Sequence, residues 1–442
     1  MTEGAPWKNL LIIIVPMIIG NVFQQMYSTV DAIIVSRFVG DNALAAIGST
    51  MSLFFFILAF FIGITSGASI MVSQYFGAKR REELSHTIGT SITILTVISI
   101  IIMILGPMVT LPLLRLLNTP EAIIGWAASY INILLRGILG VAYYNMLSGI
   151  LRGLGDSFSP LVYLIIANII SMLLSLLFVP VLGLGVAGAA IATVIAQFIS
   201  GILCLRRLMQ MCNVFDMSLK YLRPSRKYVM QIIKLGVPVG VSQAVFALSM
   251  VLMQPLINGF GPVLIAASVI VIRIDGFVMM PIFSFGNAAM VYTGQNIGAG
   301  KLNRVSQGTR QCILMAIGTS TVIVIGILLF GSTAAGLFTD TGEILDLSMY
   351  LLRVLAFGYI VMALSQVLWG VILGAGDTIT PMWTSIITVV IRVPVAYLLI
   401  YLTGSPASTY YAMLIAWIIG GMFAIVFYRA GKWRTKGLIN QG

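Results

Sequence analysis

Charged residues are scarce in this chain. Its 442 residues include 59% hydrophobic and only 9% charged residues, and the mean hydropathy is +1.06. A soluble domain usually carries about 25% charged residues, so this chain cannot cover a water-facing surface. The composition therefore predicts a polytopic membrane protein that is surrounded by the lipid bilayer.

Histidine and cysteine are almost as rare. The single histidine, His86, lies in a charged loop, which leaves no pattern for a histidine base or a zinc site. Cys204, Cys212 and Cys312 all lie on or near the basic side of the chain, so no disulfide framework is expected. The phosphate-loop pattern GxxxxGK followed by Ser or Thr is absent. We expect no enzyme, no cofactor and no direct use of ATP, and we expect an ion gradient to supply the energy.

The net charge of +12 could suggest nucleic-acid binding, but the basic residues cluster between long apolar windows. Windows of about 20 apolar residues predict membrane-spanning helices. The first window is too long for a signal peptide, so we expect it to be retained as a span. Twelve spans are predicted, at residues 9–35, 48–72, 88–112, 125–150, 160–180, 186–208, 228–258, 264–292, 310–332, 346–374, 382–403 and 409–428.

The distribution of lysine and arginine predicts the orientation. With the N-terminus in the cytoplasm, 19 of the 25 basic residues lie in or beside cytoplasmic segments, and only Arg37 and Arg115 lie on the opposite side. This asymmetry follows the positive-inside rule and favours an even number of spans. We expect a plasma-membrane protein whose two termini and whose segment 209–227 are cytoplasmic.

The two halves of the sequence resemble each other. Three pairs of short motifs recur at an offset of 221 residues: GDNALAA with GPVLIAA, QYFGAKR with QNIGAGK, and GLGDSFSP with GAGDTITP. Six spans in each half imply parallel repeats, related by a pseudo-two-fold axis along the membrane normal, with a cavity between them. The predicted architecture is an N-terminal lobe at 1–208, a linker at 209–227 and a C-terminal lobe at 228–442 with a basic tail. Two such lobes suit transport by alternating access.

Several motifs in both halves resemble the MATE family, the multidrug and toxic compound extrusion transporters. They include YSTVDAIIVSRFVGDNALAAIG, SQYFGAKRREE, LRGLGDSFSP and MPIFSFGNAAMVYTGQNIGAGK. The resemblance implies a monomer that exports amphipathic, often cationic compounds in exchange for inward H⁺ or Na⁺. The pattern is closer to the DinF and MepA-like branches than to the NorM branch, because the seventh span, GVPVGVSQAVFALSMVLMQP, lacks the glutamate that is expected there in NorM-like members.

The first span carries one carboxylate, Asp31, near the middle of the membrane. A charge at this depth costs at least about 2.5 kcal/mol, and removal from water favours the neutral form, so this acid can exchange a proton. The equivalent residue in the second half is Leu252 or Met253, so the fold does not require an acid here. Asp31 ends a polar stripe on the helix, which also contains Asn21, Gln24, Tyr27 and Ser28.

The fifth span predicts a partner face, since Asn168, Ser171 and Ser175 follow a helical spacing. By the resemblance, an Asn and an Asp usually occupy the positions of Ser171 and Ser175, and they form an ion site with the first-span Asp and a sixth-span Thr, here Thr193. The two serines weaken a Na⁺ site, so we favour H⁺. We therefore expect an ion-coupling group whose members are Asp31, Tyr27, Ser171, Ser175 and Thr193.

Substrate binding is expected from polar and adaptable side chains in the two lobes, namely Gln24, Ser28, Asn168, Gln243, Asp275 and Met279. Two alternatives stay open for Asp275, which can bind substrate or form a structural ion pair with Arg392. Met279 can adapt to varied apolar ligands or simply fill space. Asp156 and Asp377, in the turns RGLGD and LGAGD, are candidate helix N-caps.

Two other functions fit the same fold. One is the export of a single metabolite, which the sequence does not distinguish from multidrug export. The other is the flipping of a lipid-linked precursor, which calls for a cavity ringed with several basic residues. Only Arg136 and Arg353 could line such a cavity here, so this alternative is disfavoured.

Overall fold

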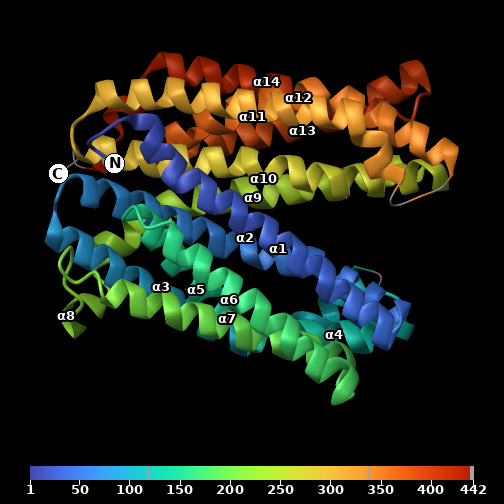
Figure 1. Cartoon of the computed structure of the whole chain (residues 1–442), viewed down its shortest axis with the longest axis horizontal. Coiled ribbons are helices and arrows are strands. Elements are labelled where there is room, and N and C mark those ends of the chain that lie inside the picture. The colour runs from blue at the N-terminus through green and yellow to red at the C-terminus, as the bar shows by residue number, and fades with distance from the viewer. Residues whose placement is uncertain (118, 337–338, 340, 439–442) are drawn as a thin grey trace. The chain divides into compact units, whose positions relative to one another are not determined.

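The computed structural model describes residues 1–117, 119–336, 339 and 341–438, and the elements in these ranges are helices joined by short loops (Figure 1). Within these ranges, eleven helices are long and apolar enough to cross a membrane, and the number is twelve if the bent pair Glu121–Arg136 and Ile138–Gly153 forms one span. The prediction of an all-α polytopic membrane protein is therefore confirmed.

The chain forms two compact units, one of residues Val15–Gly240 and one of Met1–Ile14 with Val241–Gly442. The helix α1 therefore begins in the second of these units and continues in the first, while α9 does the reverse. The elements up to the linker are α1 (Pro6–Val39), α2 (Asp41–Gly77), α3 (Arg81–Leu116), α4 (Glu121–Arg136), α5 (Ile138–Gly153), α6 (Phe158–Leu176), a π-helical turn (Leu177–Val181), α7 (Gly185–Met209) and α8 (Leu219–Leu222).

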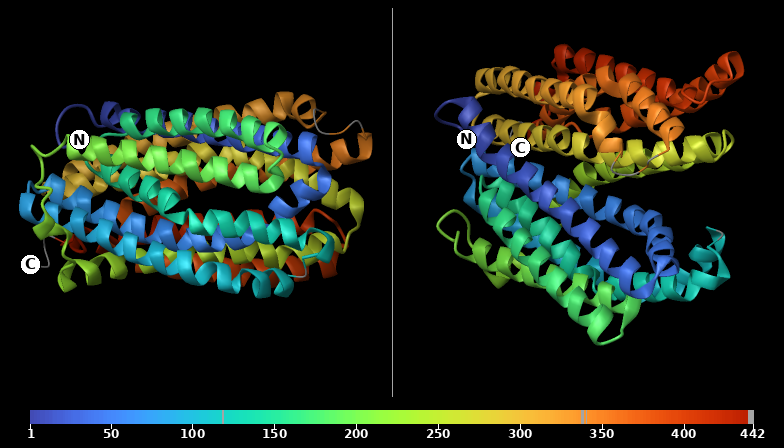
Figure 2. Two further views of the ribbon diagram at one scale, coloured as in Figure 1. Left: turned by 90° about the horizontal axis from the view of Figure 1, so that it is seen from below. Right: turned by 45° about the vertical axis from the view of Figure 1, so that its right-hand side comes forward.

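The second half repeats the pattern of long helices. Within each unit the long helices lie side by side with roughly aligned axes, and the chain reverses direction from one to the next (Figure 2). The elements are α9 (Arg226–Asn258), α10 (Pro262–Gly298), α11 (Leu302–Gly336), α12 (Gly342–Gly374), α13 (Ile379–Thr403), α14 (Ser408–Ala430) and a final 3₁₀ turn (Lys432–Thr435). The last residues of the expected C-terminal lobe, 439–442, lie outside the described residues.

The fourth predicted span, 125–150, is not one straight helix. It is divided at Gly137 into α4 and α5, which meet at an angle of 51°. A Cβ atom at Gly137 would lie 2.3 Å from the side chain of Val194 on α7. The bend therefore brings the backbone of this span against α7 at a distance that only glycine allows.

Glycines also allow a close contact between α2 and the start of α9. A Cβ atom at Gly63 would lie 2.6 Å from the carbonyl oxygen of Gly236, and one at Gly67 would lie 2.7 Å from that of Ile232. Small residues let membrane helices approach to backbone contact, which maximises van der Waals packing where no hydrophobic effect is available. This packing attaches the first turns of α9 to the unit of residues 15–240.

The linker is held on the start of α3. Arg81 forms an ion pair with Asp216 at 2.7 Å and donates hydrogen bonds to the backbone oxygens of Cys212 and Asn213. The ring of His86 lies between those of Tyr221 and Tyr228, with ring centroids 4.7 and 5.2 Å away. His86 thus lies on α3, not in the loop that the sequence suggested, and it packs against the linker and the start of α9. In the described part of the chain no cluster of metal-ligating side chains is found.

The two aspartates expected at helix starts accept hydrogen bonds three residues on. The Oδ1 atom of Asp156 accepts from the backbone N–H of Ser159 at 3.0 Å, and that of Asp377 accepts from Thr380 at 3.2 Å. Each aspartate therefore satisfies one backbone donor in the first turn of α6 or α13.

Candidate functional site

Asp31 lies inside the unit of residues 15–240. It is 9% exposed, and its Oδ1 atom accepts a hydrogen bond of 2.8 Å from the hydroxyl of Ser175 on α6. A hydrogen bond to an ionised group is about twice as strong as one between neutral groups. Ser175 therefore stabilises the carboxylate that burial penalises.

Tyr27 lies one helical turn before Asp31 and joins the other two predicted coupling residues. Its hydroxyl accepts a hydrogen bond from Ser171 at 2.9 Å and lies 2.8 Å from Oγ1 of Thr193. Thr193 donates its own proton to the backbone oxygen of Ala189 at 3.0 Å. Tyr27 must then donate to Thr193, so the hydroxyls form one directed chain that ends on a backbone carbonyl.

The two side-chain pairs also fix the relative direction of α1 and α6. Tyr27 pairs with Ser171, and four residues later Asp31 pairs with Ser175. The two helices therefore run parallel. Two parallel spans must have an odd number of spans between them, and three lie between α1 and α6 when α4 and α5 together form one span and α6 is the fifth.

An aromatic residue that the sequence reasoning missed completes the site. Tyr130 on α4 is buried and interacts electrostatically with Asp31 and Tyr27. It packs in an apolar cluster with Ile34, Val35 and Leu134. Its position near Asp31 is a contact between α4 and α1, which no hydropathy pattern reveals. A polar tip within an apolar span was the one available signal.

The expected substrate-binding residues of α1 and α6 do not all join this cluster. Gln24 and Ser28 are exposed, whereas Asn168 is buried on the same face of α6 as Ser171. The Nδ2 atom of Asn168 is enclosed and donates to no atom of the described residues. Among the three residues, Asn168 is therefore the one placed beside the coupling group.

The remaining candidates lie in the other unit. Gln243 on α9 is exposed, and Asp275 and Met279 on α10 are partly buried. Four ion pairs with N–O distances of 4.0 Å or less occur among the described residues, and Asp275 with Arg392 is not one of them. The two side chains interact electrostatically over a longer distance.

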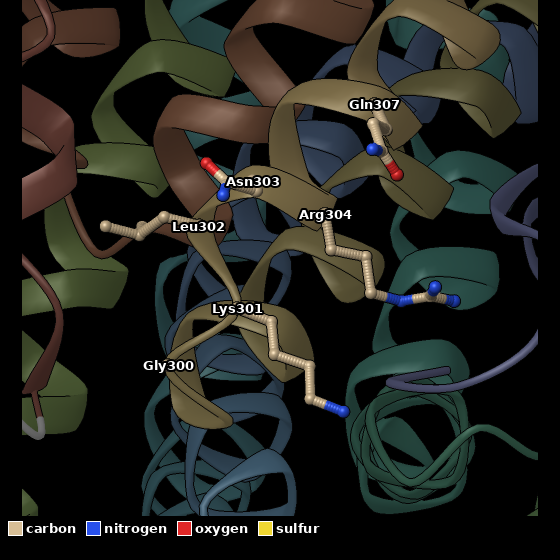
Figure 3. Close-up of a pocket in the computed structure, with 6 residues that line it drawn as sticks. All are labelled: Gly300, Lys301, Leu302, Asn303, Arg304 and Gln307. Carbon is tan, nitrogen blue, oxygen red and sulfur yellow. The ribbon is translucent and has the colours of Figure 1, made fainter.

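A pocket of about 430 Å³ lies at the turn between α10 and α11, and the sequence did not indicate it. It is lined by Gly300, Lys301, Leu302, Asn303, Arg304 and Gln307, and the two basic side chains extend from the same side of the turn (Figure 3). The guanidinium of Arg304 donates to the backbone oxygens of Met1 and Glu3. Burial lowers the pKa of the Met1 amine, and the neighbouring Arg304 lowers it further.

Comparison with known proteins now assigns the family. The family model MatE matches residues 16–177 and 238–398, so it matches once in each half of the chain. The chain belongs to the MATE family. The paired matches agree with the internal repeat that the sequence motifs predicted.

Curated relatives of this MATE protein cover nearly its whole length. The probable multidrug resistance protein YoeA of Bacillus subtilis is 30% identical over 91% of this chain and 89% of its own length. The protein YpnP of the same organism, also described as a probable multidrug resistance protein, is 27% identical over 100% of this chain and 98% of its own. Relatives named NorM and MepA occur as well, so the branch within the family stays a prediction.

Solved structures share the fold. A crystal structure of a MATE protein in complex with MaL6 has a TM-score of 0.91, 23% identity, and coverage of 97% of both chains. A transporter of the MOP superfamily from Pyrococcus furiosus, described as having a binding pocket of reverse polarity, also has a TM-score of 0.91 at 23% identity, and covers 97% of this chain and 96% of its own.

Proposed function

We propose that this protein is a secondary antiporter that exports amphipathic, often cationic organic compounds in exchange for inward H⁺. The observation that carries the proposal is the burial of Asp31 against Ser175, within a cluster of hydroxyl groups. The names of the relatives YoeA and YpnP support multidrug compounds as the substrate class.

The geometry favours a proton over a sodium ion. Asp31 is the one carboxylate of the cluster, and the hydroxyls of Ser171, Tyr27 and Thr193 are already ordered into a chain of their own. A site for a hard cation needs several oxygen atoms with free lone pairs, preferably with more than one negative charge. A proton needs only the carboxylate.

Coupling follows from the two protonation states of Asp31. The ionised carboxylate accepts a strong hydrogen bond from Ser175 but pays the cost of burying a charge. The neutral acid accepts a weaker hydrogen bond and avoids that cost. A bound ion drives alternating access only through its different affinity for the two conformations. The two states of Asp31 supply such a difference. We place the transporter in the plasma membrane as a monomer, with both termini and the segment 209–227 in the cytoplasm.

The test is transport by purified protein in proteoliposomes. Substitution Asp31→Asn keeps the shape of the side chain but removes its titration, so gradient-driven efflux should be abolished while substrate binding and gradient-free exchange survive. The matched control is Asp41→Asn, which alters an exposed aspartate at the start of α2 and should leave transport at the wild-type level.

Each part of the proposal has its own contrary result. Full gradient-driven efflux in the Asp31→Asn variant would place coupling elsewhere. Transport that requires Na⁺ and ignores a pH gradient would exclude the proton as the coupling ion. Strict preference for a single metabolite, or movement of lipid-linked precursors only, would replace the substrate class with one of the two alternative functions.

A further inference from the structure

The C-terminal half contains a second cluster of polar and charged groups within its helices. It is formed by Ser249 on α9, Asp275 on α10, Tyr359 on α12 and Arg392 on α13. All four residues belong to the unit that contains residues 241–442. The proposed coupling site uses none of them.

The guanidinium of Arg392 is deeply buried but only partly bonded. The side chain is 9% exposed, and its Nη1 atom donates to the hydroxyl of Ser249 at 2.9 Å. Its Nε atom is enclosed and donates to no atom of the described residues. Arginine presents five donors in a rigid fork that matches a carboxylate, so this group has unused capacity to bind an anion.

Weakly bonded polar groups lie in the same cluster. One carboxylate oxygen of Asp275 and the hydroxyl of Tyr359 are enclosed and make no hydrogen bond of ordinary geometry, although the two side chains interact with each other. Tyr359 is 0% exposed. Leaving a buried donor or acceptor unpaired is costly, and leaving a buried charge unpaired costs more. Asp275 interacts electrostatically with Arg392 and with Tyr359, yet each of the three side chains keeps an enclosed polar atom without a well-formed hydrogen bond, which points to a ligand that pairs with them.

The separation of the two charges restricts what that ligand can be. Asp275 and Arg392 do not close into an ion pair within 4.0 Å, although each acts electrostatically on the other. A compound that carries both an ammonium and a carboxylate has the complementary charges. A simple cation would satisfy Asp275 alone, and a simple anion would satisfy Arg392 alone.

We propose that Arg392 and Asp275 bind amphipathic zwitterions, with the carboxylate of the ligand on the guanidinium and its ammonium on Asp275. Tyr359 adds a hydroxyl beside the ammonium. This inference names a substrate class for the proposed exporter and rests on that function, but its test is equilibrium binding and needs no gradient.

Three compounds that share an indole ring but differ in charge test the two ends of the ligand separately. They are tryptophan as the zwitterion, tryptamine as the cation and indole-3-propionate as the anion. Binding is measured with purified protein in nanodiscs. Wild-type protein should bind tryptophan about 10- to 100-fold more tightly than either singly charged compound, because each additional hydrogen-bonded charge contributes on this scale. Equal binding of all three compounds by the wild type would overturn the proposal.

Two single variants test the two ends of the ligand. Arg392→Gln should bring tryptophan binding down to the level of tryptamine and leave tryptamine unaffected. Asp275→Asn should bring it down to the level of indole-3-propionate. Arg353→Gln, which removes an exposed arginine of α12, should change none of the three affinities. A uniform loss of all three in Arg392→Gln would assign Arg392 a purely structural role.

A single substitution can leave the other charge buried without a partner and prevent folding. The double variant Asp275→Asn with Arg392→Gln avoids this, because both replacements are neutral and neither leaves a buried charge. It should bind the three compounds with equal affinity. Retained preference for tryptophan in the double variant would show that the zwitterion is recognised elsewhere.

Discussion

The internal repeat lets two pairs of parallel helices be compared residue by residue. In the first pair, α1 and α6, Tyr27 meets Ser171 and Asp31 meets Ser175 through hydrogen bonds of 2.9 and 2.8 Å. All four side chains are buried. This pair therefore consists of two polar contacts, one helical turn apart, of which one includes a carboxylate.

In the second pair, α9 and α13, the same positions carry different chemistry. Ser249 lies 222 residues after Tyr27, and Arg392 lies 221 after Ser171. They form the equivalent contact at 2.9 Å, now from a guanidinium to a hydroxyl. The positions that match Asp31 and Ser175 are Met253 and Ala396, which pack together in an apolar cluster with Ala412.

The comparison separates what the fold requires from what the chemistry requires. Both helix pairs keep the same contacts between equivalent positions, so the packing of α1 on α6 does not depend on an acid. The apolar pair Met253 and Ala396 shows that methyl groups fill this space equally well. The buried acid Asp31 is therefore not needed for this packing, which supports its proposed role in coupling, and the other half places its acid on α10 instead.

The largest effect on stability is expected when the helix pair α9 and α13 is given the acid that α1 and α6 carry. Substitution Met253→Asp buries a carboxylate where Ala396 offers no hydrogen bond, at a cost of at least about 2.5 kcal/mol. The measurement is thermal unfolding in nanodiscs, with Met253→Leu as the control that keeps volume and should cost less than about 1.5 kcal/mol. Adding Ala396→Ser should recover part of the loss. Wild-type stability for Met253→Asp alone would show that this position has access to water.

A smaller effect is expected from removing the donor to Asp31. Ser175→Ala deletes a hydrogen bond to a charged group, worth about 1.5 to 3 kcal/mol, and should slow proton-driven transport by roughly tenfold or more. The repeat-related change Ala396→Ser adds a hydroxyl where no acid is present and should leave transport unchanged. Equal effects of the two substitutions on transport would mean that Ser175 contributes packing alone.

Periodicity predicted the spans, and helical spacing together with the resemblance to the MATE family predicted the members of the Asp31 cluster. Hydropathy windows locate the helices, and the spacing of Tyr27 with Asp31 and of Ser171 with Ser175 places each pair on one helix face. Hydropathy could not reveal the division at Gly137, because the window around it stays apolar apart from Arg136. The position of Tyr130 near Asp31 is a contact between α4 and α1, which no pattern within a single span predicts.

The sequence also could not predict which residues of one helix face are buried. At 100° per residue, Gln24 and Asp31 point in nearly the same direction, yet Gln24 is exposed and Asp31 is buried. The difference depends on which neighbouring helix covers each turn of α1, and this is a tertiary property. The separation of Asp275 from Arg392 is of the same kind, since it is set by the positions of α10 and α13.

The smallest predicted effect concerns the cytoplasmic turns, where the repeat also differs by one charge. Asp156 and Asp377 occupy equivalent positions and accept equivalent bonds from Ser159 and Thr380. Only Asp156 also accepts from an arginine, Arg207, at 2.8 Å, and the position 221 residues after Arg207 is Tyr428.

These contacts make the contribution of Asp156 depend on pH. Partial burial by itself would raise the pKa of this carboxyl, but the bonds from Ser159 and Arg207 outweigh it and hold the pKa below its usual value. A group with a lowered pKa in the folded state stabilises the protein above its unfolded value, about 3.9, and loses that contribution as the pH falls further. Asp156→Asn should therefore cost about 1 kcal/mol at pH 7, since the arginine is partly exposed, and progressively less below pH 4. Arg207→Gln should reproduce most of this loss. A cost of Asp156→Asn that is the same at pH 7 and pH 3, measured by thermal unfolding, would contradict the electrostatic explanation and leave only the neutral capping bond.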